Sequence, residues 1–132
     1  MDVPPYGKDK PGLELLAASV RADTGELRIF LNVLAAKLSD MLPGHVVVER
    51  DEGIFRRRQS VRAMRIRLDH RVYELEWTGT DLEARLAHEV RGVLAKPQTL
   101  QLNEWATSLE RHLGERARRA TRARDALSRL LT

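Results

Sequence analysis

The stretch RAMRIRLDHRVYELEWTGTDLEARL, residues 62–86, decides the fold of this chain. Its apolar and charged residues alternate with period two, the pattern of strands that bury one face and expose the other. The alternation is interrupted at Asp69-His70 and again at residues 78–81, where the sequence is typical of tight turns. We therefore predict a three-stranded antiparallel meander over this stretch.

The register of the meander follows from its turns. A two-residue turn at Asp69-His70 places Leu68 opposite Arg71, and a slip of one residue would turn every apolar side chain outward. With this register, apolar rows gather on one face and opposite charges pair on the other. The predicted neighbours are Ile66–Tyr73–Leu86, Met64–Leu75–Ala84 and Arg62–Trp77–Leu82 on one face, with Arg65–Glu74–Arg85, Ala63–Glu76 and Glu76–Glu83 on the other.

A fourth strand is expected ahead of the meander, at residues 45–50 with the sequence HVVVER. The segment 81–95 fits two structures, because Thr80 and Glu83 match a helical capping box while the same residues also pair well as a strand. We favour the strand, because it matches its neighbour residue by residue. It then extends to Leu94, with a bulge or bend at Gly92.

Helices are predicted before and after the strands in the sequence. A first helical segment covers Leu13–Ala22, and a second covers Glu26–Leu42, which Pro43-Gly44 terminates. The second helix is apolar well beyond one face, so it requires cover on two sides. The last helix runs from Asn103, a suitable N-cap, to Leu131.

The predicted fold class is α+β, with N-terminal helical segments, a four-stranded antiparallel sheet and a long C-terminal helix packed on one sheet face. Residues 1–11 hold three of the five prolines and are expected to form a disordered lead-in. Residues 12–132 then form a single domain, and this length is sufficient for a hydrophobic core without disulfides or metal.

Composition narrows the classes of function. The chain has no cysteine, which excludes thiol chemistry and disulfides, and it has no apolar run long enough to span a bilayer or to form a signal peptide. We therefore expect a cytoplasmic protein. The formal net charge is +4, and arginine strongly outnumbers lysine. Such a surplus fits an anionic partner, and it equally fits ordinary solvated surfaces.

No pattern of catalytic residues is recognisable. The four histidines are scattered over different predicted elements, which does not indicate a metal site, and glycine-rich phosphate loops and nucleophile motifs are absent. Glu76 and Glu83 face each other across the sheet and could raise one another's pKa, but Arg65 and Arg85 lie close enough to neutralise them. We predict that the protein is not an enzyme and uses no cofactor.

The leading hypothesis is a protein–protein interaction module, such as an adaptor, chaperone-like protein or assembly subunit, that forms a homodimer or binds another protein. The alternative is a nucleic-acid-binding or nucleoid-associated protein. The order of elements resembles that of two groups of small dimeric proteins, bacterial secretion chaperones and nucleoid-associated proteins, and this resemblance assigns no site residue. The predicted partner-binding residues are Phe30, Val33, Lys37, Ile54 and Phe55, and the predicted anion-binding residues are Arg56, Arg57, Arg58, Arg62, Arg116 and Arg119.

Overall fold

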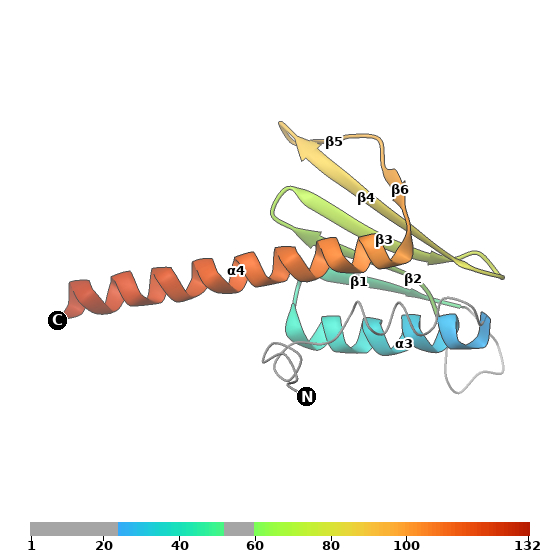
Figure 1. Ribbon diagram of the computed structural model, residues 1–132, viewed down its shortest axis with the longest axis horizontal. Coiled ribbons are helices and arrows are strands. Elements are labelled where there is room, and N and C mark those ends of the chain that lie inside the picture. Colours follow the sequence, from blue (N-terminus) through green and yellow to red (C-terminus); the bar gives the residue numbers. More distant parts are fainter. Residues whose placement is uncertain (1–23, 52–59) are drawn as a thin grey trace, which may run out of the picture.

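A computed structural model describes residues 24–51 and 60–132 of the chain (Figure 1). The predicted helix over residues 13–22 and the predicted lead-in lie outside these ranges. The described part is α+β. Its elements are α3 (Thr24–Met41), β1 (Val46–Arg50), β2 (Val61–Leu68), β3 (Arg71–Trp77), β4 (Leu82–Val90), β5 (Val93–Leu94), β6 (Gln98–Leu100) and α4 (Leu102–Leu131).

The strands form one curled antiparallel sheet in the order β1-β2-β3-β4-β5, with β6 also paired to β4. The predicted register of the meander is confirmed from Ala63 onward: Ile66 faces Tyr73, and Tyr73 faces Leu86. The choice of a strand for the segment after residue 81 is also confirmed. Asp69 has the positive φ angle, 56°, that the tight β2–β3 turn requires.

The prediction of four strands was wrong. β4 ends at Val90, and Arg91 and Gly92, with φ angles of 55° and 81°, form a tight turn rather than a bend within a longer strand. The chain then returns as β5, and β6 adds to β4 with Ala84 opposite Leu100. The sheet therefore has six strands, because a short segment on each side of Pro97 pairs with β4.

The core lies between the inner face of the sheet and both helices. α3 packs on β1 and β2, and α4 packs on β4. Two of the predicted rows, Ile66–Tyr73–Leu86 and Met64–Leu75–Ala84, enter this core as buried side chains. In the third row Leu82 is buried, but Arg62 is exposed. Helix α3 contributes Leu27, Phe30, Leu31, Leu34, Ala35 and Leu38, and α4 contributes Trp105, Ala106 and Leu109.

Helix α4 is only half covered by the sheet. Its N-cap is Gln101, so Asn103 lies within the first turn rather than at the predicted cap. Its buried residues end at Gly114, and all later residues except the half-buried Arg116 are exposed. Figure 1 shows the C-terminal half of the helix extending far beyond the sheet. We call residues 115–131 the α4 arm.

Candidate functional site

The outer face of the meander carries a compact network of charges around Arg85. Its guanidinium contacts carboxylates of Glu74, Glu76 and Glu83 at 2.5, 2.9 and 2.6 Å. Burial by itself raises the pKa of Glu74, but hydrogen bonds from Arg65 and Arg85 outweigh it and hold that pKa below its ordinary value. The network therefore keeps Glu74 ionised and pairs all three glutamates with Arg85, which suits a structural role.

A second polar network joins the β2–β3 turn to the middle of α4. The buried ring of His112 lies between Asp69 and Tyr73, with Nε2 at 2.7 Å from the Asp69 carboxylate and Nδ1 at 2.9 Å from the Tyr73 hydroxyl. An ionised carboxylate only accepts hydrogen bonds, so Nε2 carries a proton. The other ring nitrogen, Nδ1, shares a hydrogen bond with the Tyr73 hydroxyl. The buried hydroxyl and ring nitrogens are thus fully satisfied.

Asp69 also receives two arginines from α4. Nη1 of Arg116 lies 3.0 Å from one carboxylate oxygen, and Nη2 of Arg119 lies 2.9 Å from the other. The hydrogen bond from His112, followed by those interactions with Arg119 and Arg116, lowers the pKa of Asp69 from 3.8 to about 2, against a smaller opposing effect of burial. Asp69 therefore fixes the position at which α4 leaves the sheet.

We expect Asp69→Asn to lower the free energy of unfolding by about 1 kcal/mol at pH 7, because the side chain is a third exposed and solvent screens its ion pairs. Asparagine tolerates the positive φ angle, so the change isolates the charge. The folded state depresses this pKa, so the contribution is present above about pH 4 and is lost as pH falls toward 2.

Urea denaturation of both proteins between pH 2 and 7 measures this difference. Asp125→Asn on the α4 arm is the matched control, because no ion pair of Asp125 is present among the described residues. A difference between Asp69→Asn and the wild type that persists unchanged at pH 2 would contradict the assignment.

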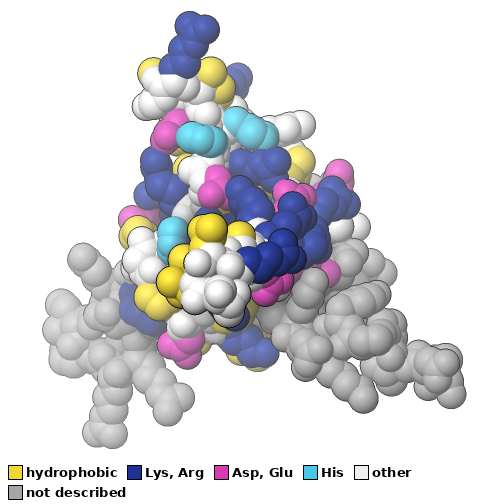
Figure 2. All heavy atoms as spheres, turned by 90° about the vertical axis from the view of Figure 1, so that its left-hand side faces the viewer, with side chains coloured by type: hydrophobic (Ala, Val, Ile, Leu, Met, Phe, Trp, Pro, Cys, Tyr) yellow, Lys and Arg dark blue, Asp and Glu magenta, His cyan; other side chains and the backbone are white. Residues whose placement is uncertain are grey.

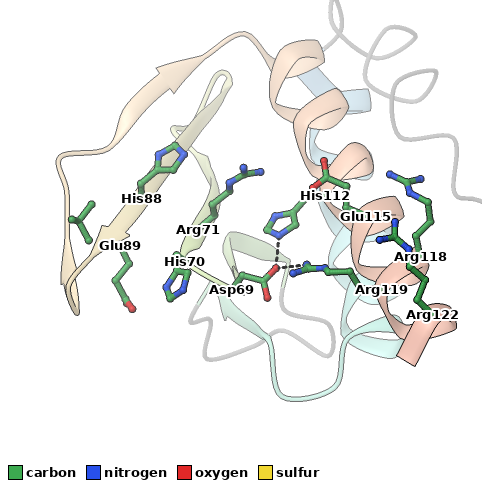
Figure 3. Close-up of a pocket in the computed structure, with 11 residues that line it drawn as sticks. Asp69, His70, Arg71, His88, Glu89, His112, Glu115, Arg118, Arg119 and Arg122 are labelled. Carbon is green, nitrogen blue, oxygen red and sulfur yellow. Dashed lines mark hydrogen bonds and ion pairs between the residues drawn. The ribbon is translucent and has the colours of Figure 1, made fainter. Parts of the chain in front are cut away.

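Beside the Asp69 network lies an open hollow of about 630 Å³ (Figure 3). The ends of β3 and β4 and the β2–β3 turn form one side of it, and α4 forms the other. Arg71 and His88 are opposite one another in the sheet register. We call this cavity the basic hollow. It is lined by Asp69, His70, Arg71, His88, Glu89, Val90, His112, Glu115, Arg118, Arg119 and Arg122.

The apolar face of the packed half of α4 continues along the α4 arm, which is therefore amphipathic. Ala120, Ala123, Leu127 and Leu130 follow one another at intervals of three or four residues, and Ala120 lies eight residues, about two turns, after His112. They therefore share the face that is buried further back. On the arm this face is exposed, with Leu127 56% and Leu130 83% accessible. Figure 2 shows hydrophobic side chains on one side of the arm and a cluster of basic ones on the other.

Four arginines form the basic side of α4. Arg111, Arg118, Arg122 and Arg129 are spaced by seven or four residues and share one face of the helix. They make no ion pair within the described residues. Of the other arginines of α4, Arg116 and Arg119 are held by Asp69, and Arg124 is exposed away from the stripe.

The structure describes three of the five predicted partner-binding residues. Phe30 is 3% exposed and belongs to the core, so it offers nothing to a partner. Val33 is 40% exposed and Lys37 is exposed on the outer side of α3. Ile54 and Phe55 lie outside the described residues.

Three of the predicted anion-binding residues, Arg56, Arg57 and Arg58, also lie outside the described residues. Arg62 is exposed, 3.7 Å from Glu49. Arg116 and Arg119 come together, but around a carboxylate of the protein itself.

The sequence reasoning did not identify Asp69, Arg71 and His112 as neighbours of the α4 arginines. Asp69 and His112 were assigned to separate elements, and no local pattern connects a turn to a helix more than forty residues later. One signal was available, since a buried histidine on the apolar face of α4, next to Leu109 and Leu113, requires polar partners from the sheet.

Comparison of the chain with protein-family models, with curated proteins and with solved structures finds no match. Among residues 24–51 and 60–132, no helix is long and apolar enough to cross a membrane. The same residues contain no cluster of histidine and acidic side chains arranged to hold a metal ion. The assignment of a function therefore depends on the surfaces described above.

Proposed function

We propose that this protein is a non-enzymatic binding module that docks onto an acidic protein partner through its α4 arm. The observation that carries the proposal is the apolar face of α4, which continues past the end of the sheet with nothing in the described structure to cover it. The arm would insert into an apolar groove of the partner, as amphipathic helices commonly do.

The apolar side chains of the arm give a physical reason for docking. Leu127, Leu130 and Leu131 are among the most exposed large hydrophobic residues of the described chain. Full burial of one leucine side chain contributes about 1.5–3 kcal/mol. The helix preceding the arm is already fixed by Trp105 and Asp69, so the start of the arm is held in position before a partner binds, which reduces the entropy lost on binding.

The charge of the arm selects the partner. Between residues 115 and 131 the sequence has six arginines against Glu115 and Asp125. Asp69 neutralises part of the charge of Arg116 and Arg119, and the other four arginines remain free in the described structure. A groove rimmed by aspartate and glutamate would complement this surplus and accelerate association.

The same charge argues against pairing of two α4 arms. Two copies would bring like charges together, and unpaired like charges across an interface are costly. The predicted homodimer stays a prediction, and another surface of the protein would have to form it.

Site-specific photo-crosslinking in the native cells tests the proposal. A photoreactive amino acid at Ala123 lies on the apolar face of the arm, and one at Thr80, in the exposed β3–β4 loop, is the matched control. We expect Ala123 to crosslink to one protein, at an acidic segment with apolar residues. The control position should give no such product.

Reconstitution with that partner then measures the contribution of the apolar face. The double substitution Leu127→Ser and Leu130→Ser should weaken binding at least tenfold, whereas Val90→Ser, an exposed apolar residue on β4, should not. Crosslinks only to a second copy of the chain, or no crosslink from the arm at all, would overturn the proposal.

The basic stripe favours nucleic acid as the second candidate. Arg111, Arg118, Arg122 and Arg129 on one face could follow a phosphate backbone. We rank this function lower because each described phosphate-binding candidate is isolated from stacking aromatic side chains, which single-strand binders use. A nuclease-sensitive crosslink from Ala123 would select this alternative over the protein partner.

A further inference from the structure

The basic hollow beside Asp69 has more positive charge than its own carboxylates can neutralise. Of its three acidic residues, Asp69 binds His112, Arg116 and Arg119, and Glu89 binds Arg67 at 2.6 Å. Two of those arginines, Arg67 and Arg116, do not line the hollow. The negative charges of Asp69 and Glu89 are therefore already neutralised, in part by arginines that lie outside the cavity.

The remaining cationic groups have no such partner. Arg71, Arg118 and Arg122 line the hollow and form no ion pair within the part of the chain that the structure describes. Glu115 is the one lining carboxylate without an ion pair there. Three free guanidinium groups against one free carboxylate leave an excess of positive charge.

The arrangement of these groups suits an anion with several oxygen atoms. Arg71 and His88 are neighbours across β3 and β4, and Arg118 and Arg122 come from the facing helix, one turn apart (Figure 3). A guanidinium group donates two parallel hydrogen bonds to a phosphate, and an imidazole N–H adds a further donor.

We propose that the basic hollow binds a phosphate monoester, with Arg71, Arg118 and Arg122 as the charged donors and His88 as an additional donor. The volume of about 630 Å³ exceeds that of a phosphate group and lies within the range typical of small-molecule sites. The ligand is therefore an organic phosphate whose phosphoryl group is held between β3–β4 and α4. A monocarboxylate would neutralise less of the charge.

Titration of the isotope-labelled protein alone tests this site, so the result does not depend on the docking partner. Inorganic phosphate, glycerol phosphate and acetate are added at constant ionic strength, and the NMR signals of Arg71, His88 and Arg118 are followed. We expect saturable shifts with glycerol phosphate, with a dissociation constant on the order of 1 mM, weaker saturable shifts with inorganic phosphate, and no saturation with acetate.

Two double variants distinguish a specific phosphate-binding site from non-specific electrostatic attraction to the helix. Arg118→Gln with Arg122→Gln should weaken glycerol phosphate binding about tenfold or more. Arg124→Gln with Arg129→Gln removes the same charge from exposed positions of the same helix outside the hollow, and should leave binding within about twofold.

Two results would overturn the proposal. One is equal loss of affinity in both double variants, because binding would then reflect only the net charge of the helix. The other is a set of non-saturating shifts spread over all exposed arginines. Circular dichroism of each variant confirms that the helix content is unchanged.

Discussion

Trp105→Ala is expected to lower the free energy of unfolding by about 3–5 kcal/mol. The indole is fully buried at the junction of α4 and the sheet, where it packs edge-on against Tyr73 with ring centroids 6.1 Å apart. Its Nε1 donates a hydrogen bond to the carbonyl oxygen of Arg85 at 3.1 Å. Truncation creates a cavity and leaves that carbonyl without its donor.

Urea denaturation followed by circular dichroism measures the loss. Trp77→Ala is the matched control, because Trp77 is only half-buried at the edge of the core and its ring faces the guanidinium of Arg28, 5.3 Å from the ring centroid. We expect the control to lose about 1–2 kcal/mol. Equal losses in the two variants would show that Trp105 is not the principal anchor of α4.

Arg85→Met is expected to destabilise the protein by about 2–3 kcal/mol at pH 7. The arginine side chain is 22% exposed and contacts three glutamates, two of which, Glu76 and Glu83, face each other across the sheet. Without the guanidinium, these carboxylates repel one another on a partly buried face. The repulsion raises their pKa values in the folded state, so the loss is largest above about pH 5 and declines as the carboxylates gain protons.

Arg65→Met provides the comparison on the same face. Arg65 is 52% exposed, and among the described residues its ion pair is with Glu74 alone, so its removal should cost less than about 1 kcal/mol. Denaturation at pH 7 and pH 4 distinguishes the two roles. If Arg85→Met were equally destabilising at both pH values, lost packing of the side chain rather than carboxylate repulsion would explain the effect.

The meander could be predicted pair by pair because two constraints agree at every position. The turn at Asp69-His70 sets the register, and the alternation of residues such as Ile66 and Arg65 permits only that register. The outer charge network was predictable for the same reason, because cross-strand neighbours such as Glu74 and Arg85 follow directly from pairing.

The edge of the sheet was harder to predict. Val93–Leu94 and Gln98–Leu100 are too short for periodicity to distinguish a strand from a loop. Their pairing depends on the tight turn at Arg91–Gly92, where a non-glycine residue takes a positive φ angle. The sequence indicated a bulge or bend at Gly92 within one longer strand, whereas the chain reverses there.

The candidate site could be predicted least, because it depends on where the sheet ends beneath α4. The sequence predicts a long helix, but it does not specify that burial of the helix against the sheet ends at Gly114. That end point determines which arginines are free. Arg116 and Arg119 reach Asp69, whereas Arg118 and Arg122 do not, and this distinction requires the three-dimensional position of a turn far away in the sequence.

Amide hydrogen exchange along α4 tests the central claim, that the α4 arm is the docking element, most directly. We predict that residues 117–131 exchange rapidly in the protein alone at every concentration and become protected in the complex with the crosslinked partner, while residues 102–114 stay protected in both. Protection that arises elsewhere in the complex with the arm unchanged, or protection of the arm that increases with the concentration of the protein alone, would contradict it.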